Sequence, residues 1–240
     1  MPGHISPKEL KRDRFVETVV QAEEYAFSHA RNLWLAVGAA ALILAAVFGW
    51  RFWSAQQSQK ASVAFDAAMK SFEARIRAPG EPEEPGETTY VFEKLKYQDA
   101  RKKFDEVAGK YSLTQQGTLA RYYSALCSVH LDEKDKAGAE LRTLASGSNA
   151  EVTSLAKLSL AEMAWKDGKP DDAAKILTDL IDHPTALVPK ARAQMALAGV
   201  YRKTKPAEAA KIYEQVKKDF PDTPLSEEAD RRLTELGPVS

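Results

Sequence analysis

The chain has 240 residues, with 34 basic and 34 acidic side chains and therefore a formal net charge of zero. Without a surplus of positive charge, the sequence argues against a nucleic-acid-binding protein, which needs a basic face. Cys127 is the only cysteine, so an intramolecular disulfide and a cysteine metal cluster are both excluded. Hydrophobic residues make up 44% of the chain, which is enough to build a globular domain.

The first predicted element is a membrane span. Residues Leu33–Trp50 form a run of 18 residues without a charge, between Arg31 and Arg51. As a helix this run is about 27 Å long, close to the hydrocarbon thickness of a bilayer, and tryptophans stand at both of its ends. A cleaved signal peptide fits less well, because 32 residues precede the run and the residues after it match a cleavage site poorly. We therefore predict an uncleaved transmembrane helix over residues 33–53.

Residues 1–32 are predicted to be a cytoplasmic tail. Five basic residues precede the span and only two follow it closely, a bias that favours the N-terminus in the cytoplasm and the C-terminal domain outside it. The inverted topology is the alternative. Apolar residues between Phe15 and Phe27 recur at helical spacing, which predicts an amphipathic helix on the inner membrane surface or an extension of the anchor helix.

The remaining residues, 54–240, follow a period of 36 residues. Two segments match at that spacing, Ala161–Leu177 and Leu197–Tyr213, and both contain Ala-Ala-Lys-Ile shortly after a Lys-Pro pair. Two earlier units follow at steps of 36 and 37 residues. A single helical hairpin cannot bury its apolar face, but stacked hairpins share a continuous core. We predict an all-α superhelix of about four tetratricopeptide-like hairpins, closed by a charged capping helix over Ser226–Leu236.

Small and large residues alternate along each unit. Pro170 and Pro206 suit helix starts, where a missing N–H costs nothing. Small side chains allow close contact between helices, and larger ones are expected to fill the gaps of the core. The small positions are Ala161, Ala173 and Ala209, and the larger ones are Trp165, Leu177, Tyr201 and Tyr213.

The first unit contains an insertion. Residues 61–78 are expected to form its first helix, with Phe65, Met69 and Phe72 directed inward. Residues 79–89 follow with three prolines and two glycines among acidic residues, which predicts a solvated, mobile loop.

The repeats resemble the tetratricopeptide repeat. The pattern of a bulky residue followed by Gly168, Ala173, Leu177 and Leu180 is typical of it, as is a proline after the second helix. The unit departs from that pattern in its length of 36 residues rather than the usual 34, and in the residues Asp132 and Thr204 that stand where a turn glycine is expected.

The resemblance implies a binding groove, because first helices line the concave face of such stacks. His130, Lys166 and Arg202 are spaced by 36 residues near the ends of three successive first helices. They could form a basic row, flanked by Tyr122, Glu162 and Gln194, that binds an acidic peptide or a free C-terminal carboxylate. The alternative is that each basic side chain only complements the dipole of its own helix.

Chemical motifs are not apparent. The sequence has no phosphate-binding loop and no nucleophile elbow, and the histidines His4, His29, His130 and His183 lack metal-ligand spacing. We therefore expect a protein that is not an enzyme and that has no cofactor and no metal site.

The layout of a tail, one span and a few degenerate repeats resembles the bacterial membrane-anchored family of the ancillary SecYEG translocon subunit YfgM. That resemblance implies a scaffold in the inner membrane with a periplasmic repeat domain, which assists secretion or folding of envelope proteins and contacts the Sec translocon and a periplasmic chaperone. A coordinator of cell division or wall synthesis, and a cytoplasm-facing adaptor, are the alternatives.

Overall fold

The computed structural model describes residues 7–237 apart from 79 and 83–84, and their side chains from residue 34 onward. The predicted amphipathic face of residues 15–27, the side chain of His29 and all of His4 lie outside this description. Within the described part there are nine helices and two short strands. They are α1 (Pro7–Glu73), β1 (Arg75–Ile76), β2 (Thr89–Tyr90), α2 (Glu93–Lys110), α3 (Gln115–His130), α4 (Lys134–Ala145), α5 (Ala150–Lys166), α6 (Pro170–Asp182), α7 (Lys190–Thr204), α8 (Pro206–Asp219) and α9 (Pro224–Leu236).

The chain divides into two compact units, residues 1–56 and 57–240. The first compact unit, residues 1–56, holds the apolar part of α1. An 18-residue window there has a mean hydropathy of 1.9, and none of its residues is buried. Trp34, Leu42 and Phe48 are each more than 70% exposed there. Water disfavours such a surface and lipid does not, so this stretch has the length and composition of a membrane span or a signal anchor.

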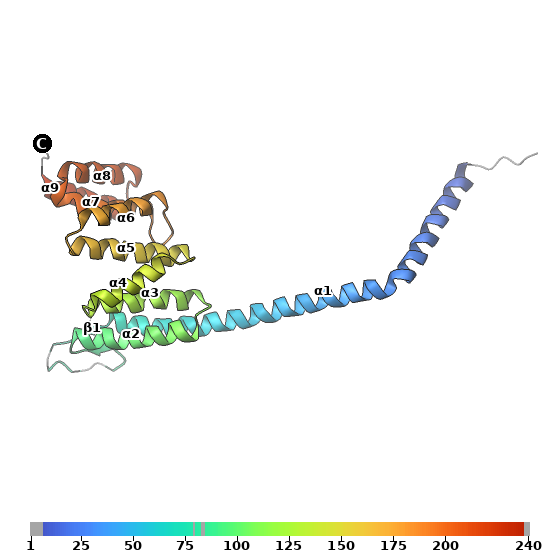
Figure 1. Ribbon diagram of the computed structural model, residues 1–240, viewed down its shortest axis with the longest axis horizontal. Coiled ribbons are helices and arrows are strands. Elements are labelled where there is room, and N and C mark those ends of the chain that lie inside the picture. The colour runs from blue at the N-terminus through green and yellow to red at the C-terminus, as the bar shows by residue number, and fades with distance from the viewer. Residues whose placement is uncertain (1–6, 79, 83–84, 238–240) are drawn as a thin grey trace, which may run out of the picture. The chain divides into compact units, whose positions relative to one another are not determined.

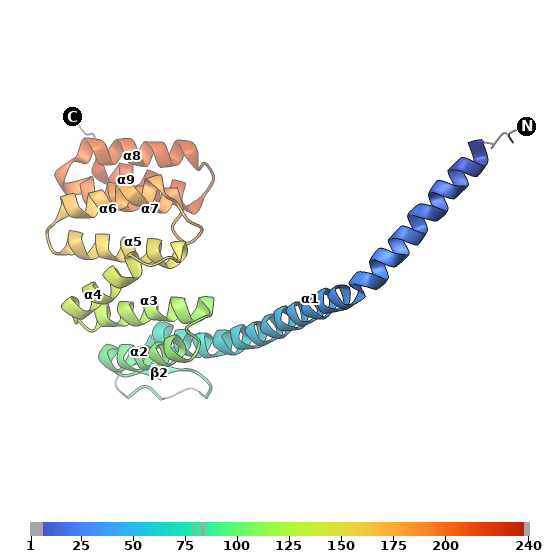
Figure 2. The same cartoon turned by 45° about the vertical axis from the view of Figure 1, so that its right-hand side comes forward.

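The second unit is a stack of helical hairpins, as predicted. The end of α1 pairs with α2, and α3–α4, α5–α6 and α7–α8 are the following hairpins (Figures 1 and 2). The second helix of each hairpin also packs on the first helix of the next, from α2 on α3 to α8 on α9. Helix α9 covers the last hairpin, so the predicted superhelix with a capping helix is confirmed.

The alternation of small and large residues explains this packing, with one exception. Ala173 and Ala209 are fully buried, and Leu177 and Tyr213 are no more than 2% exposed. Trp165 was expected to fill the core in the same way, and that expectation is wrong. Trp165 is 43% exposed, because it borders a cavity between α5 and α7 instead of being enclosed by them.

An aromatic cluster forms the core of the first hairpin. Phe72 of α1 meets Tyr97, Phe104 and Tyr123 with ring centroids 5.5 to 6.1 Å apart in edge-to-face arrangements. Phe65 packs on Phe104 at 5.5 Å. Each such pair contributes about 0.5–1.5 kcal/mol beyond the area that it buries. The end of α1 is therefore an integral part of the repeat core.

The turns after α3 and α5 have the same geometry although their sequences differ. Gly168 has φ +74°, and Asp132, 36 residues earlier, has φ +59°. In both turns the next amide donates a hydrogen bond back into the helix, from Lys169 to the carbonyl of Ala164 and from Glu133 to that of Ser128. This left-handed helix ending satisfies carbonyls that the helix leaves free. The same turn therefore forms with Asp132 in place of a glycine, and the period of 36 residues is kept.

The helix predicted over residues 61–78 is the last part of α1, and it ends earlier than expected, at Glu73 and not at residue 78. Arg75 and Ile76 are extended and pair in parallel with Thr89 and Tyr90, so the two ends of the insertion are held together. Arg75 also contacts Glu81 at 2.8 Å. The insertion is thus tied at its base by backbone pairing and by an ion pair.

Candidate functional site

The three basic residues of the predicted row occupy equivalent places. His130, Lys166 and Arg202 lie in the last turns of α3, α5 and α7, the first helices of successive hairpins. Each of them has an intramolecular partner. This arrangement is compatible with a row on one face, and equally with three separate helix ends that carry a favourable charge.

His130 is held by aromatic rings. Its imidazole stacks on Tyr97 with 4.0 Å between ring centroids, although the residue remains accessible to solvent. This partial burial lowers the pKa of His130, and the positive charges of Lys96 and Lys166 lower it further, against the opposing influence of Glu93. At neutral pH the row therefore carries two positive charges and a neutral ring.

Lys166 and Arg202 are paired with carboxylates. Lys166 contacts Glu162 at 2.8 Å, one turn earlier on α5, and both side chains are about 60% exposed. Arg202 contacts Glu235 of α9 at 3.3 Å. Exposed pairs of this kind contribute little to stability and exchange readily with water, so both cations are available to an anionic partner.

Tyr122 and Gln194 lie inside the helix packing, each 7% exposed, whereas Glu162 is at the surface. The hydroxyl of Tyr122 lies 3.0 Å from that of Ser159, which links α3 to α5. Burial raises the pKa of Tyr122. The amide oxygen of Gln194 has no hydrogen-bond partner among the described residues. Tyr122 and Gln194 therefore belong to the packing between helices and not to the exposed surface that a partner would contact.

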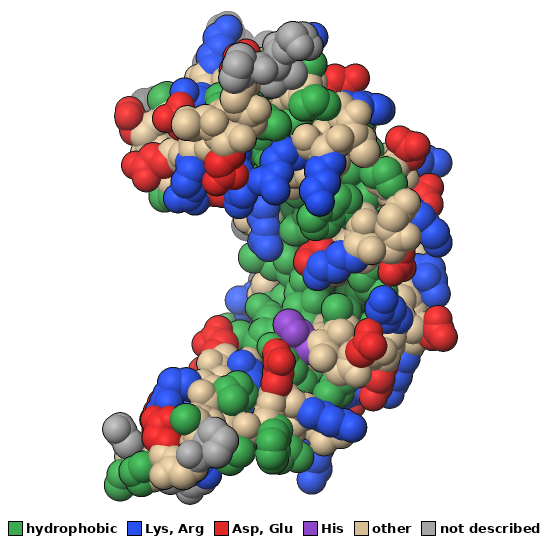
Figure 3. All heavy atoms as spheres, turned by 90° about the vertical axis from the view of Figure 1, so that its left-hand side faces the viewer, with side chains coloured by type: hydrophobic (Ala, Val, Ile, Leu, Met, Phe, Trp, Pro, Cys, Tyr) green, Lys and Arg blue, Asp and Glu red, His purple; other side chains and the backbone are tan. Residues whose placement is uncertain are grey.

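Two adjoining cavities lie over α5, α7 and α9, and sequence reasoning did not find them. One, of about 340 Å³, lies between α5 and α7, and the other, of about 370 Å³, extends to α9. They share Trp165, Ala196 and Gly199 in their walls, and together they form what we call the Trp165 groove. Figure 3 shows the hollow face of the repeat unit, with hydrophobic side chains along its floor and Lys and Arg side chains gathered on its upper lip.

The walls of the Trp165 groove combine apolar and charged residues. Leu158, Ala161 and Val200 add to its apolar surface. Its charged residues are the cations Arg192, Arg202, Lys203 and Arg232 and the anions Glu162 and Glu228. Two candidates from the sequence, Glu162 and Arg202, therefore line the groove. The signal that could have found it is Gly199, a glycine in a helix interior where no turn requires one.

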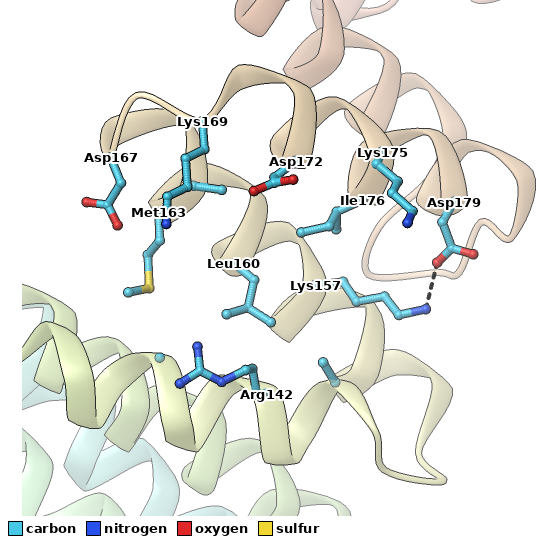
Figure 4. Close-up of a pocket in the computed structure, with 13 residues that line it drawn as sticks. Arg142, Lys157, Leu160, Met163, Asp167, Lys169, Asp172, Lys175, Ile176 and Asp179 are labelled. Carbon is cyan, nitrogen blue, oxygen red and sulfur yellow. Dashed lines mark hydrogen bonds and ion pairs between the residues drawn. The ribbon is translucent and has the colours of Figure 1, made fainter.

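A third cavity, of about 670 Å³, lies on another surface, between α4, α5 and α6 (Figure 4). Leu160 and Ile176 form part of its floor, and Arg142 and Asp172 point into it from opposite sides. Lys157 pairs with Asp179 at 2.6 Å at one end. Charges of both signs line this cavity in nearly equal number, so its surface does not favour an anionic or a cationic partner.

Nucleophilic chemistry is not supported at the single cysteine. Cys127 is fully buried, and burial raises the pKa of its thiol to about 12. Over the described residues, no group of three His, Cys, Asp or Glu side chains is placed to hold a metal ion. What the surface offers instead is a hollow with apolar and cationic walls, which is suited to binding.

Comparison with known protein families agrees with this architecture. The family described as tetratricopeptide repeat-like domain matches residues 28–192, more than half of the chain. A second family, described as tetratricopeptide repeat, matches residues 192–223. Searches of curated proteins and of solved structures give no significant match.

Proposed function

Because the chain belongs to the tetratricopeptide repeat-like domain family, we propose that it is a membrane-tethered scaffold that binds other proteins through its repeat unit. Repeats of this kind are typically non-catalytic interaction modules. The observation that carries the proposal is a single helix, α1, that contains an uncharged, exposed stretch of membrane-spanning length and then enters the core of the repeats. A tether built into the binding domain confines its partners to the membrane surface.

The proposed topology has residues 1–32 in the cytoplasm, a span over residues 33–53 and the repeat domain in the periplasm of a bacterium. The excess of basic residues before the span supports it. A reporter active only in the periplasm, fused after Ser240, should be active, and a cytoplasmic reporter at the same place should be silent. The reverse pattern would contradict this orientation and leave the cytoplasm-facing adaptor.

The proposed role is to assist secretion or folding of envelope proteins near the Sec translocon. Support comes from the order of tail, span and degenerate repeats, which resembles the translocon-associated family. The alternative is a coordinator of cell division or wall synthesis, supported by the same architecture. The two differ in their partners and not in their fold.

Photocrosslinking in living cells separates these roles. A photoreactive residue at Ala196, in the Trp165 groove, is compared with one at Glu214, an exposed position on α8 away from the groove. Adducts with translocon subunits or a periplasmic chaperone would support the proposed role, and adducts with wall synthases would favour the alternative. The absence of protein adducts at both positions would contradict a scaffold.

A further inference from the structure

We infer that the Trp165 groove binds an extended acidic segment of a partner protein, which places one apolar side chain beside Trp165 and carboxylates at both ends of a stripe on α7. The inference rests on the proposed scaffold function and adds the chemistry of the partner to it. Three features of the groove carry it: an exposed tryptophan, a stripe of small residues between two cations, and a glycine that the fold does not need.

The exposed tryptophan marks an apolar binding surface. Trp165 is 43% exposed in a unit whose other large aromatic side chains are mostly packed. It borders both cavities, and the smaller cavity is otherwise lined mainly by aliphatic side chains and alanines. A tryptophan beside an apolar hollow is a common centre of binding energy at protein interfaces. A volume of about 340 Å³ admits a side chain such as leucine or phenylalanine.

The stripe lies along one face of α7. Arg192, Ala196, Gly199 and Lys203 follow one another at spacings of four, three and four residues, which keeps them on the same side of a helix. All four line the groove. The stripe therefore has a cation at each end and two small residues between them, against which a partner's backbone can approach closely.

The two end cations are not neutralised by the fold. Arg192 donates a hydrogen bond to the carbonyl of Leu187, and neither Arg192 nor Lys203 has a carboxylate partner among the described residues. Arg202 contacts Glu235, and Arg232 contacts both Glu228 and Glu235, so these two guanidinium groups are paired within the fold. The surplus of positive charge in the groove therefore comes from Arg192 and Lys203. This surplus is local, since the whole chain has a formal net charge of zero. It complements an acidic segment.

Gly199 lowers the stability of α7, and no packing contact requires a glycine there. A Cβ atom at Gly199 would meet nothing within 4 Å, so packing does not exclude alanine there. A glycine in a helix interior is less stable than alanine by about 0.5–1 kcal/mol. Gly199 does, however, stand in the shared wall of the two cavities, and its missing side chain keeps the groove open.

The spacing of the cations sets the length of the segment. Arg192 and Lys203 are about three turns apart, or roughly 16 Å along α7. In an extended chain alternate side chains point to the same side, and residues four positions apart are about 13 Å apart. The long side chains of Arg192 and Lys203 cover the remaining roughly 3 Å. The recognised pattern is then an acidic residue, an apolar residue two positions later, and a second acidic residue two positions after that.

The test measures binding of fluorescein-labelled peptides with the core Glu-Thr-Leu-Thr-Glu to the full-length protein in lipid nanodiscs. Replacing both glutamates by glutamine, or the leucine by serine, should weaken binding about tenfold or more. Lys203→Glu should weaken binding of the acidic peptide by a similar factor and improve that of a peptide with lysines in place of the glutamates. The matched control Lys211→Glu makes the same charge change at an exposed position on α8 and should have no effect.

Gly199→Ala provides a second, independent measurement. We expect this variant to melt at a higher temperature than wild type and to bind the acidic peptide more weakly, a combination that a purely structural glycine would not produce. Equal affinity for the acidic, neutral and basic peptides, no binding at millimolar concentration, or unchanged binding by Lys203→Glu would each overturn the inference. Protein adducts at Ala196 together with any of these results would leave the scaffold function standing and reject only the acidic segment.

Discussion

The imidazole of His130 lies nearly flat on the ring of Tyr97, with 8° between the two planes. Phe72 meets the same imidazole edge-on, with ring centroids 5.9 Å apart. Residues from α1, α2 and α3 thus converge at one ring. This pair of stacked rings joins the first hairpin to the second at the end of α3. The stability of the junction therefore depends on whether His130 is protonated.

Acid should weaken this junction. The pKa of His130 is lowered in the folded protein from an ordinary value of 6.5, so the unfolded chain takes up the proton more readily. The stability that depends on the neutral ring is fully present above that value and is lost as the pH falls through the lowered pKa. His130→Phe keeps an aromatic ring without a titratable group. Wild type should therefore lose more stability than this variant as the pH is lowered. The melting temperature of His130→Phe minus that of wild type should be larger at about pH 5 than at about pH 7.5.

A suitable control is Tyr97→Phe, which keeps a ring under the imidazole and leaves His130 in place. Its melting temperature should differ from that of wild type by the same amount at both pH values. A constant difference between His130→Phe and wild type across this range would show that the stack does not couple to protonation.

The small positions of the stack should not tolerate larger side chains. Ala173 and Ala209 are fully buried between helices, and Ala173→Leu or Ala209→Leu forces side chains off their preferred rotamers. We expect each variant to lose about 1–3 kcal/mol of stability in urea titrations followed by circular dichroism. Lys211→Leu, an exposed position on the same helix as Ala209, should change it by less than about 0.5 kcal/mol. Equal stability of the buried variants and the control would contradict the packing.

The turn after α5 should require its glycine. Gly168 has φ +74° and open space around it, so Gly168→Ala meets no clash and only a strained backbone, at a cost of about 1–2 kcal/mol. Gly109→Ala is the matched control, because that glycine lies in the last turn of α2 with helical backbone and equally open space. It should be neutral or mildly stabilising. Thermal melts should therefore show a lower melting temperature for Gly168→Ala and an unchanged or slightly higher one for Gly109→Ala.

The two ion pairs that Arg101 makes with α4 and its start should matter more for stability than the exposed pairs. The side chain of Arg101 is 14% exposed and lies 2.6 Å from Glu133 and 3.3 Å from Glu140, which joins α2 to α4. The carboxylates are partly solvated, so we expect Arg101→Met to cost about 1–2 kcal/mol rather than the full value of a buried pair. Lys166→Met breaks an exposed pair and should cost less than about 0.5 kcal/mol. Denaturant titrations that rank the two variants in the opposite order would refute this assignment.

Residues such as Ala173 and Ala209 explain why the fold could be predicted from the sequence. A position where two helices touch must stay small in every unit, so the period is visible even where the rest of the repeat has diverged. Trp165 shows the limit of this reasoning. A bulky apolar residue at a repeating position gives the same sequence pattern whether it fills a core or borders a cavity. Only the structure, with a cavity between α5 and α7, shows which of the two applies to Trp165.

The site was therefore predicted only in part. Arg202 and Glu162 line the Trp165 groove, but Arg192 and Lys203 do not recur at the repeat spacing and were missed. The parallel pairing of Arg75 and Ile76 with Thr89 and Tyr90 was missed for a related reason. Two-residue strands that meet across an insertion have no periodic signal, since their pairing depends on where the chain returns.

The exposed indole of Trp165 also gives the groove an optical signal of its own. The chain has four tryptophans, and the other three, Trp34, Trp50 and Trp53, belong to the apolar part of α1. In a protein with phenylalanine at those three positions, all tryptophan emission would come from the groove. Indole emission shifts to shorter wavelength when water is excluded. A bound partner that covers the 43% of Trp165 now open to solvent would therefore be detected as a blue shift, without any label.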